Sequence, residues 1–401
     1  MKIMMYKGQS GYDALRVFAD ELADNLKKSG HEVLMLDFTK PEEADRTLQE
    51  IAEGKSSFFP DVIVSMNGIG ANLRNREGRL YHNEIGVPFV SYIVDHPLYH
   101  HGRLTTHLRN HHVICVNQGF ADYVAEYYKR IRSVNVLMQA GIAPEHEEIL
   151  PLSERIYDVV FMGTYRNEKE IEKQIEQSDP TVRDVSLCMA ETLITHPEYH
   201  LEQSLEVVLT RAQVTLKKEA FAETMNAMHL VDKYVRALYR RLVVKSLVEH
   251  GIHVDVWGEH WEEILPELSS PSLLTIHKPV SYRKAAEIYA QAKIVLNVMP
   301  WAKEGLHDRI LGTILSGAVS VSDETTTLKR EWEEKEEIVL YSLEHLEKLP
   351  KLVRGLFENP GRMQKIADAG RKHAGMGHDW NARTRELEVI LQKIVNAEWE
   401  R

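Results

Sequence analysis

Short apolar runs alternate with stretches of helical periodicity along most of the chain. Residues 2–6 form an apolar run, residues 12–28 carry apolar side chains at helical spacing, and Gly30 ends that pattern. Strands that alternate with helices are typical of parallel sheets whose two faces are covered by helices, so we predict an α/β protein. The expected strands are residues 2–6, 32–37, 61–66, 88–94, 113–116 and 134–138, then 157–163, 253–257, 274–277, 293–298, 318–322 and 338–341.

Two interruptions of this alternation divide the chain. Residues 143–155 form a polar, proline-containing connector, and residues 180–250 show helical patterns without a strand signal. We therefore expect two α/β domains of similar size. They are residues 1–150 and residues 151–376, with a helical insertion at about 180–250 in the second, followed by a last segment at 377–401.

The charge balance and hydropathy narrow the range of functions. The 401 residues include 49 Lys and Arg against 60 Asp and Glu, a formal net charge of −11. Such a chain is repelled by polyanions, which argues against a nucleic-acid partner but leaves room for a local basic pocket that binds one phosphate ligand. The apolar start is too short for a signal segment, and no run of about 18 apolar residues occurs. We expect a soluble, cytoplasmic protein without a transmembrane segment.

Cysteine and histidine usage gives no sign of a metal centre. Cys115 and Cys188 lie among apolar residues and no CxxC pair occurs. Six histidines lie between residues 96 and 112, but Pro97 and Gly102 interrupt any helical register among them and no HExxH motif is present. We therefore predict neither a metal nor a resident cofactor.

A candidate anion site follows the apolar run at 293–298. Residues 310–315 carry a helical apolar stripe, and Gly317 ends this helix before the next run. His307, Asp308 and Arg309 therefore fall at a helix N-terminus, which favours a diphosphate or a similar anion. The alternative is that Asp308 merely caps the helix while Arg309 pairs with a surface acid.

Four more residues directly follow other apolar runs of the second half. Gly163 and Arg166 follow one run, Gly258 follows a second, and Asp323 follows a third. Ligands of open α/β sheets bind beyond the carboxyl ends of the strands, so these residues outline one cleft together with the helix start. Taken singly, each is equally compatible with an ordinary turn glycine or a surface charge.

The segment 278–323 resembles the donor-domain signature of GT-B glycosyltransferases, in particular the CgeB-like group related to spore maturation proteins. It has the Pro-Val-x-Tyr start ending at Tyr282, the Leu-Asn strand, the His-Asp-Arg helix start and the Ser-Gly-Ala strand that ends in Asp323. The tail is similar too, with Asn-Pro at 359–360, Ala-x-x-Gly within 366–370, and His-Asp-Trp at 378–380 followed by Arg383. The resemblance covers roughly residues 155–400 and more loosely the first half.

This resemblance implies a glycosyltransferase that moves a sugar from a nucleotide-sugar, with UDP-sugars the expected donors, to a hydroxyl of a protein, polysaccharide or small molecule, without an obligatory metal. The second domain would hold the donor and the first the acceptor, in clefts that face each other, and the helix at 380–399 would cross back to the first domain. The donor-binding residues carried over are His307 and Arg309 at the diphosphate, Gly163 and Arg166 in its loop, and Gly258 and Tyr282 beside the base.

One position departs from the resemblance. Many relatives use a Glu three residues after the Arg to hold the ribose, and this chain has Gly312 there. Asp308 is a possible substitute.

A general base is also needed if the sugar configuration inverts. Asp95 and His96 directly follow the apolar run at 88–94 and are our candidates for this catalytic role. Because Pro97 restricts the backbone of the preceding residue, a purely structural loop is the alternative.

Two other functions stay open. A nicotinamide-dependent dehydrogenase would show G-x-G-x-x-G, and residues 68–73 come nearest but have Leu73 at the third glycine position. A non-catalytic nucleotide-sugar-binding protein would keep the donor cleft and lack transfer.

Overall fold

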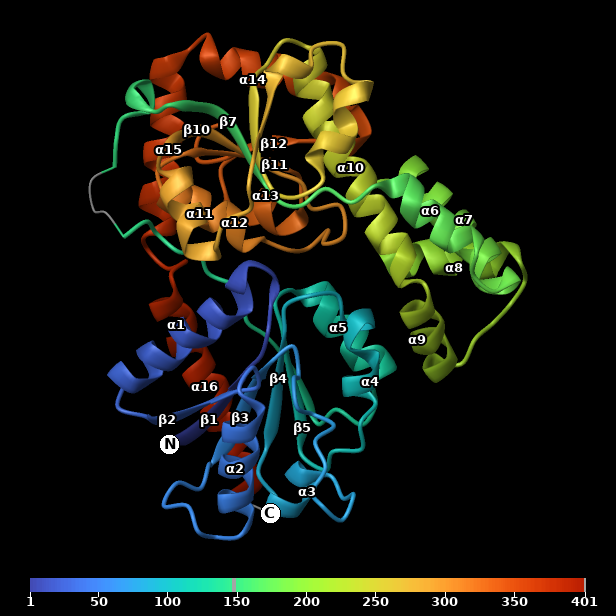
Figure 1. Cartoon of the computed structure of the whole chain (residues 1–401), viewed down its shortest axis with the longest axis vertical. Helices are drawn as coiled ribbons and strands as arrows, with labels where there is room; N and C mark the ends of the chain where they lie inside the picture. Colours follow the sequence, from blue (N-terminus) through green and yellow to red (C-terminus); the bar gives the residue numbers. More distant parts are fainter. Residues whose placement is uncertain (146–148, 400–401) are drawn as a thin grey trace. The chain divides into compact units, whose positions relative to one another are not determined.

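The computed structural model describes residues 1–145 and 149–399, and the chain divides into two compact units. Unit 1 comprises Met1–Gln139 and the chain from Asp379 onward, and unit 2 comprises Ala140–His378. Each unit contains one six-stranded sheet in which all paired strands are parallel (Figure 1). The predicted α/β class with two parallel sheets is confirmed, because each apolar run of the sequence forms a strand.

Unit 1 has the strand order β2-β1-β3-β4-β5-β6. Every residue of β3, β4 and β5 is buried, as expected for strands covered on both faces. Helix α16 packs against α1, where the rings of Trp380 and Phe18 lie 4.9 Å apart. The elements are β1 (Lys2–Lys7), α1 (Ala14–Lys28), β2 (Glu32–Asp37), α2 (Pro41–Ala52), β3 (Val62–Met66), α3 (Tyr81–Ile85), β4 (Phe89–Ile93), α4 (His101–Leu104), β5 (His111–Cys115), α5 (Gln118–Tyr127), β6 (Ser133–Val136) and α16 (Trp380–Trp399).

Unit 2 has the strand order β12-β11-β10-β7-β8-β9. Its central strands β7, β10 and β11 end in buried residues, so the loops at their carboxyl ends rest on a rigid support. The elements outside the helical insertion are β7 (Tyr157–Met162), β8 (Val254–Trp257), β9 (Leu274–His277), α11 (Tyr282–Tyr289), β10 (Ala292–Asn297), α12 (Asp308–Leu315), β11 (Val319–Asp323), α13 (Thr326–Glu331), β12 (Val339–Tyr341), α14 (Leu349–Phe357) and α15 (Pro360–Ala374).

Five helices join β7 to β8 in unit 2. In Figure 1, α6 to α9 extend to one side of the unit and α10 runs back to the sheet. The helical patterns predicted for residues 180–250 are therefore found, and the helical segment already begins at Glu168. The helices are α6 (Glu168–Glu176), α7 (Pro180–Thr195), α8 (Leu201–Arg211), α9 (Lys218–Ala227) and α10 (His229–Glu249).

The division between the units falls at Gln139, whereas the sequence suggested residue 150. The chain beyond it packs on α12 of unit 2, where a Cβ atom on Gly141 would overlap the backbone nitrogen of Gly312. Residues 146–148 of the expected connector and residues 400–401 of the expected last segment lie outside the described residues. Among the helices described, none has the length and apolar character needed to cross a membrane.

Candidate functional site

The N-terminus of α12 lies in the loop beyond the carboxyl end of β10. Helix α12 begins at Asp308 because His307 is extended and caps it, with the His307 Nδ1 3.1 Å from the Arg309 amide. The residues Ile310, Leu311 and Ile314 fix the helix to the core. The predicted helix start is thus confirmed, and the free end of the helix dipole lies at the ligand-binding edge of the sheet.

Three side chains interact at this helix start. His307 Nδ1 lies 2.8 Å from the Asp308 carboxylate, and the hydroxyl of half-buried Tyr282 hydrogen-bonds the same carboxylate. Burial alone would raise the pKa of Asp308, but its close contact with His307, the charge of Arg309 and the hydrogen bond from Tyr282 lower it below its usual value. Asp308 therefore stays ionised, and neighbouring groups balance its negative charge. The contact between Asp308 and His307 orients the His307 ring.

The Arg309 side chain points into the fold. It is 9% exposed, its Nη1 donates to the Asn297 Oδ1 at 2.9 Å, and it hydrogen-bonds the Tyr289 hydroxyl. Its guanidinium also lies 5.4 Å from the centre of the Phe161 ring. These contacts tie α12 to β10 and β7, so Arg309 supports the site from inside, and its contact with a diphosphate stays a prediction.

Gly163 and Gly258 bring the ends of β7 and β8 into close contact. A Cβ atom on Gly258 would overlap the carbonyl group of Gly163 and lie 2.8 Å from the Thr164 nitrogen. Gly163 has φ +151°, and its carbonyl accepts a hydrogen bond of 2.7 Å from the Trp261 indole. Backbone packing alone therefore explains why position 258 is a glycine. The role of Gly258 beside a nucleotide base stays a prediction.

Replacing Gly258 tests this packing. We expect Gly258→Ala to lower the free energy of unfolding by about 3 kcal/mol, because the clash is with backbone that cannot rotate away. Gly355→Ala is the matched control, since Gly355 lies inside α14 with open space around it and alanine favours helix by up to ~1 kcal/mol. Denaturant titrations of both variants measure the difference. An unchanged Gly258→Ala variant would show that the two loops are not packed in this way.

Arg166 and Asp323 lie in different surroundings. Arg166 is exposed in the loop between β7 and α6. Asp323 is 2% exposed and accepts the Met299 amide at 2.8 Å, which holds the loop after β10. Burial raises the pKa of Asp323 to about 6, although the charge of Lys303 acts in the opposite direction. Donor binding by Asp323 stays a prediction, and the partners that its carboxylate has in the structure are the Met299 backbone and the Ser322 hydroxyl.

Helix α10 contributes cations that the sequence interpretation did not include. Arg240 Nη1 donates to the Thr164 carbonyl at 2.8 Å, and the Arg236 guanidinium lies 3.8 Å from the centre of the Trp301 ring. Trp301 in turn faces the His307 ring edge-on, with centroids 6.0 Å apart. The basic residues of α10 thus reach the same edge as the α12 N-terminus. Their only sequence signal is the helical spacing of Lys233, Arg236 and Arg240.

The two candidate bases in unit 1 have different environments. Asp95 is exposed, and its Oδ2 accepts a hydrogen bond of 3.0 Å from the side-chain amide Nδ2 of Asn67. His96 is 2% exposed, its Nδ1 accepts the Leu98 amide at 3.1 Å, and its ring packs edge-on against Phe120. The structure gives His96 the role of a cap for the short helix that follows and leaves Asp95 facing solvent.

The nearby histidines are held by separate partners. His101 contacts the Tyr128 hydroxyl, His111 contacts the Ser91 hydroxyl, and His112 contacts the Ser133 hydroxyl, at 3.0, 2.8 and 2.7 Å. Among the side chains that the structure describes, no three of His, Cys, Asp or Glu are grouped as metal ligands would be.

Residues 68–73 form no dinucleotide-binding turn. Gly68 and Gly70 have positive φ angles, and a Cβ atom on Gly68 would lie 2.8 Å from the Ser91 hydroxyl. The next helix, α3, begins only at Tyr81, so no helix N-terminus follows the glycines to receive a pyrophosphate. This geometry argues against the dehydrogenase alternative.

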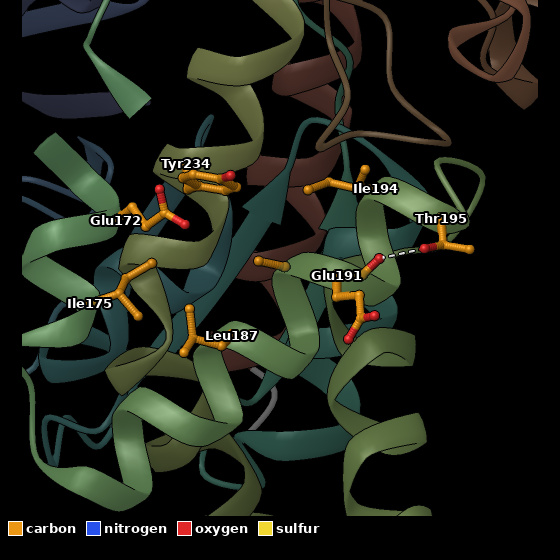
Figure 2. A pocket seen from close by; sticks show the side chains of 8 residues that line it. Glu172, Ile175, Leu187, Glu191, Ile194, Thr195 and Tyr234 are labelled. Atoms are coloured by element: carbon orange, nitrogen blue, oxygen red, sulfur yellow. Dashed lines mark hydrogen bonds between the residues drawn. The ribbon is translucent and has the colours of Figure 1, made fainter. Parts of the chain in front are cut away.

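Two pockets of unit 2 are lined by residues other than those at the N-terminus of α12. Figure 2 shows one of about 240 Å³ among α6, α7 and α10, with Glu172 and Tyr234 on facing helices. It is lined by apolar side chains and two glutamates, without a cation, so it is unsuited to phosphate. A second, of about 180 Å³, lies at the carboxyl ends of β11 and β12 and mixes Lys303 and Lys329 with three glutamates.

Solved structures of glycosyltransferases are similar in fold to this chain. The Anabaena protein HepE in complex with UDP-glucose superposes with a TM-score of 0.60 at 11% identity, over 98% of this chain and 100% of that one. The sucrose-phosphate synthase of Thermosynechococcus elongatus gives a TM-score of 0.57 at 10% identity, over 99% of each chain. A glycosyltransferase of Rickettsia africae gives 0.58 at 11%, over 98% of each. The protein has the GT-B fold.

Part of the sequence also matches a family model. A family described as glycosyl transferase-like matches residues 236–389, a segment that begins in α10 and includes the loops after β8 to β12. No curated protein matches the chain.

Proposed function

We propose that this protein is a glycosyltransferase that moves a sugar from a nucleotide-sugar donor, of the UDP class, to a hydroxyl acceptor without an obligatory metal. The observation that carries the proposal is the helix start at His307, which lies beyond the carboxyl end of β10 inside the glycosyl transferase-like match. The complex of HepE with UDP-glucose supports the choice of donor class. The CgeB-like subgroup is part of the proposal.

The chemistry requires charge stabilisation on the donor. As the bond between the anomeric carbon and the diphosphate breaks, positive charge grows on the sugar and negative charge on the leaving diphosphate. The dipole of α12 and the His307 side chain would stabilise the leaving group, a role that a divalent metal has in other transferases. In unit 1, Asp95 would accept the proton of the acceptor hydroxyl.

A thermal-shift panel tests the proposal. We expect the melting temperature to rise with UDP and with one UDP-sugar in the presence of EDTA, because a ligand at one hundred times its Kd stabilises the native state by about 2.7 kcal/mol. The panel contains UDP, GDP, CMP, UDP-glucose, UDP-N-acetylglucosamine, GDP-mannose and NAD⁺.

Each other outcome has a defined meaning. A shift with NAD⁺ alone would assign the protein to the dehydrogenases, and a shift that needs a divalent cation would overturn metal independence. Binding of a nucleotide-sugar without transfer or hydrolysis would identify a non-catalytic binding protein. The absence of any shift would contradict the proposed function and leave the fold unaffected.

A further inference from the structure

Three cations share one face of helix α10. Lys233, Arg236 and Arg240 are spaced by three and four residues, so their side chains line up along the helix over about 10 Å. A different face of α10, with Tyr234 and Ala237, packs against α6. The row is a local concentration of positive charge in a chain whose net charge is −11. It therefore needs an explanation other than the general composition.

One end of the row reaches the edge of the sheet. The Arg240 guanidinium donates to the Thr164 carbonyl, and its Cζ lies only 3.8 Å from the position of a Cβ atom on Gly163. Arg236 is stacked on Trp301 with its guanidinium 3.8 Å from the ring centre, and Trp301 contacts His307. The row is thus continuous with the α12 N-terminus through one aromatic ring.

At the other end of the row, Lys233 is within electrostatic reach of Arg166, which is exposed in the loop after β7. Burial and then the charge of Arg166 lower the pKa of Lys233, while Asp232 acts in the opposite direction. Asp232 itself pairs with Arg236 at 2.7 Å. Within the described residues neither Lys233 nor Arg166 is in an ion pair or a side-chain hydrogen bond. The repulsion between these like charges costs free energy that a bound anion would offset.

We propose that Lys233, Arg236 and Arg240, together with Arg166, form the subsite for the phosphate groups of the donor. This inference rests on the proposed function and assigns a role to the helical insertion, which lies between β7 and β8. Arginine and lysine donate charge-assisted hydrogen bonds to phosphate oxygens. They would balance the charge that grows on the diphosphate, while Arg309 supports the loops from inside.

Single charge removals at the exposed end test the subsite. Lys233→Gln and Arg166→Gln should each weaken UDP binding at least tenfold and change uridine binding less than twofold, with UMP between them, measured by calorimetry at fixed ionic strength. If the thermal-shift panel shows that the protein binds a guanine nucleotide, GDP, GMP and guanosine take the place of UDP, UMP and uridine. Because each change relieves repulsion, neither should lower the melting temperature of the free protein.

The matched control is Lys245→Gln on the same helix. Lys245 lies on a different face of α10 from the row and 3.7 Å from Glu267, so UDP affinity should stay within twofold of the native value. If the native chain binds UDP and both test variants bind it as tightly as the control does, the subsite is overturned while the proposed function stands. Equal losses for uridine and UDP would also overturn it. If the native chain binds none of these ligands, the proposed function itself fails.

Discussion

Lowering the pH from 7 to 4.5 should reduce the free energy of unfolding of unit 1 by about 5 kcal/mol through two buried histidines alone. His82 and His111 are 3% and 1% exposed, and both rings pack against Phe89, with centroids 4.5 and 5.6 Å from the Phe89 ring. Each ring makes one hydrogen bond through Nε2, to the Gly70 carbonyl and the Ser91 hydroxyl. Both Nδ1 atoms are buried without a hydrogen-bond partner in the described structure.

The direction of this pH effect on stability follows from the pKa values of the two histidines in the native and the unfolded protein. Burial lowers the pKa of His82 to about 4, against a raising effect of its hydrogen bond to Gly70. Burial, with the charges of His112 and His82, lowers the pKa of His111 to about 3. The unfolded chain binds these protons below pH ~6.5, whereas the native protein stays neutral. Stability is therefore complete above pH ~6.5 and falls as the pH drops towards 4, by up to ~1.4 kcal/mol per pH unit for each histidine.

Hydrogen exchange of amides in β3 to β5 measures this stability for unit 1 by itself. The variants His82→Gln and His111→Gln should each flatten the pH dependence, because glutamine does not titrate. His107→Gln, at an exposed position of the same unit, should leave it unchanged. Carboxylates such as Asp37 also lose stability in acid, since the hydrogen bond from Arg16 lowers its pKa, so the comparison between variants isolates the histidines. Equal slopes in all the variants would contradict the prediction.

The strands were predictable because their chemistry is local. Each apolar run is bounded by turn residues, and parallel strands buried on both faces need little else, so β2 and β9 have the predicted ends. The start of α12 was predictable for the same reason. His307 precedes an apolar helical stripe, and Gly317 with φ +69° stops it.

The surroundings of the site residues were not predictable, because they depend on contacts between distant segments. Nothing local to Arg309 indicates that Asn297 and Tyr289 will enclose its guanidinium. Arg240 lies in a segment without a recognisable motif, and only the packing of α10 brings it to Thr164. Periodicity locates an element and its faces, but the partner of each face is set by the tertiary structure.

The tail motif illustrates the same limit. Asn359 caps α15 by accepting the Arg362 amide at 3.1 Å, and Asp379 accepts the Ala382 amide at 2.7 Å at the start of α16. A Cβ atom on Gly370 would overlap the carbonyl oxygen of Glu337. Capping and close packing are therefore enough to explain why these positions hold Asn, Gly and Asp, although the same residues belong to the motif on which the family resemblance rests.

The second large effect concerns Asp95. We expect Asp95→Asn to slow sugar transfer by roughly 10²–10⁴-fold, because an amide cannot take the proton of the acceptor hydroxyl. Asparagine keeps the size of the side chain and an oxygen that can accept the Asn67 amide, which lies 3.0 Å from the native carboxylate. Donor affinity and melting temperature should therefore stay near their native values. The rate is measured as UDP release from the UDP-sugar that the panel identifies, with water or an added hydroxyl compound as acceptor.

Two control variants distinguish a catalytic role of Asp95 from a purely structural role of the loop that contains it. Asp122→Asn makes the same chemical change at an exposed position of α5 and should leave the rate unchanged. His96→Asn keeps an oxygen that can cap the helix after it, so we expect a native rate with a small loss of stability. An Asp95→Asn rate within threefold of native would remove Asp95 from the mechanism.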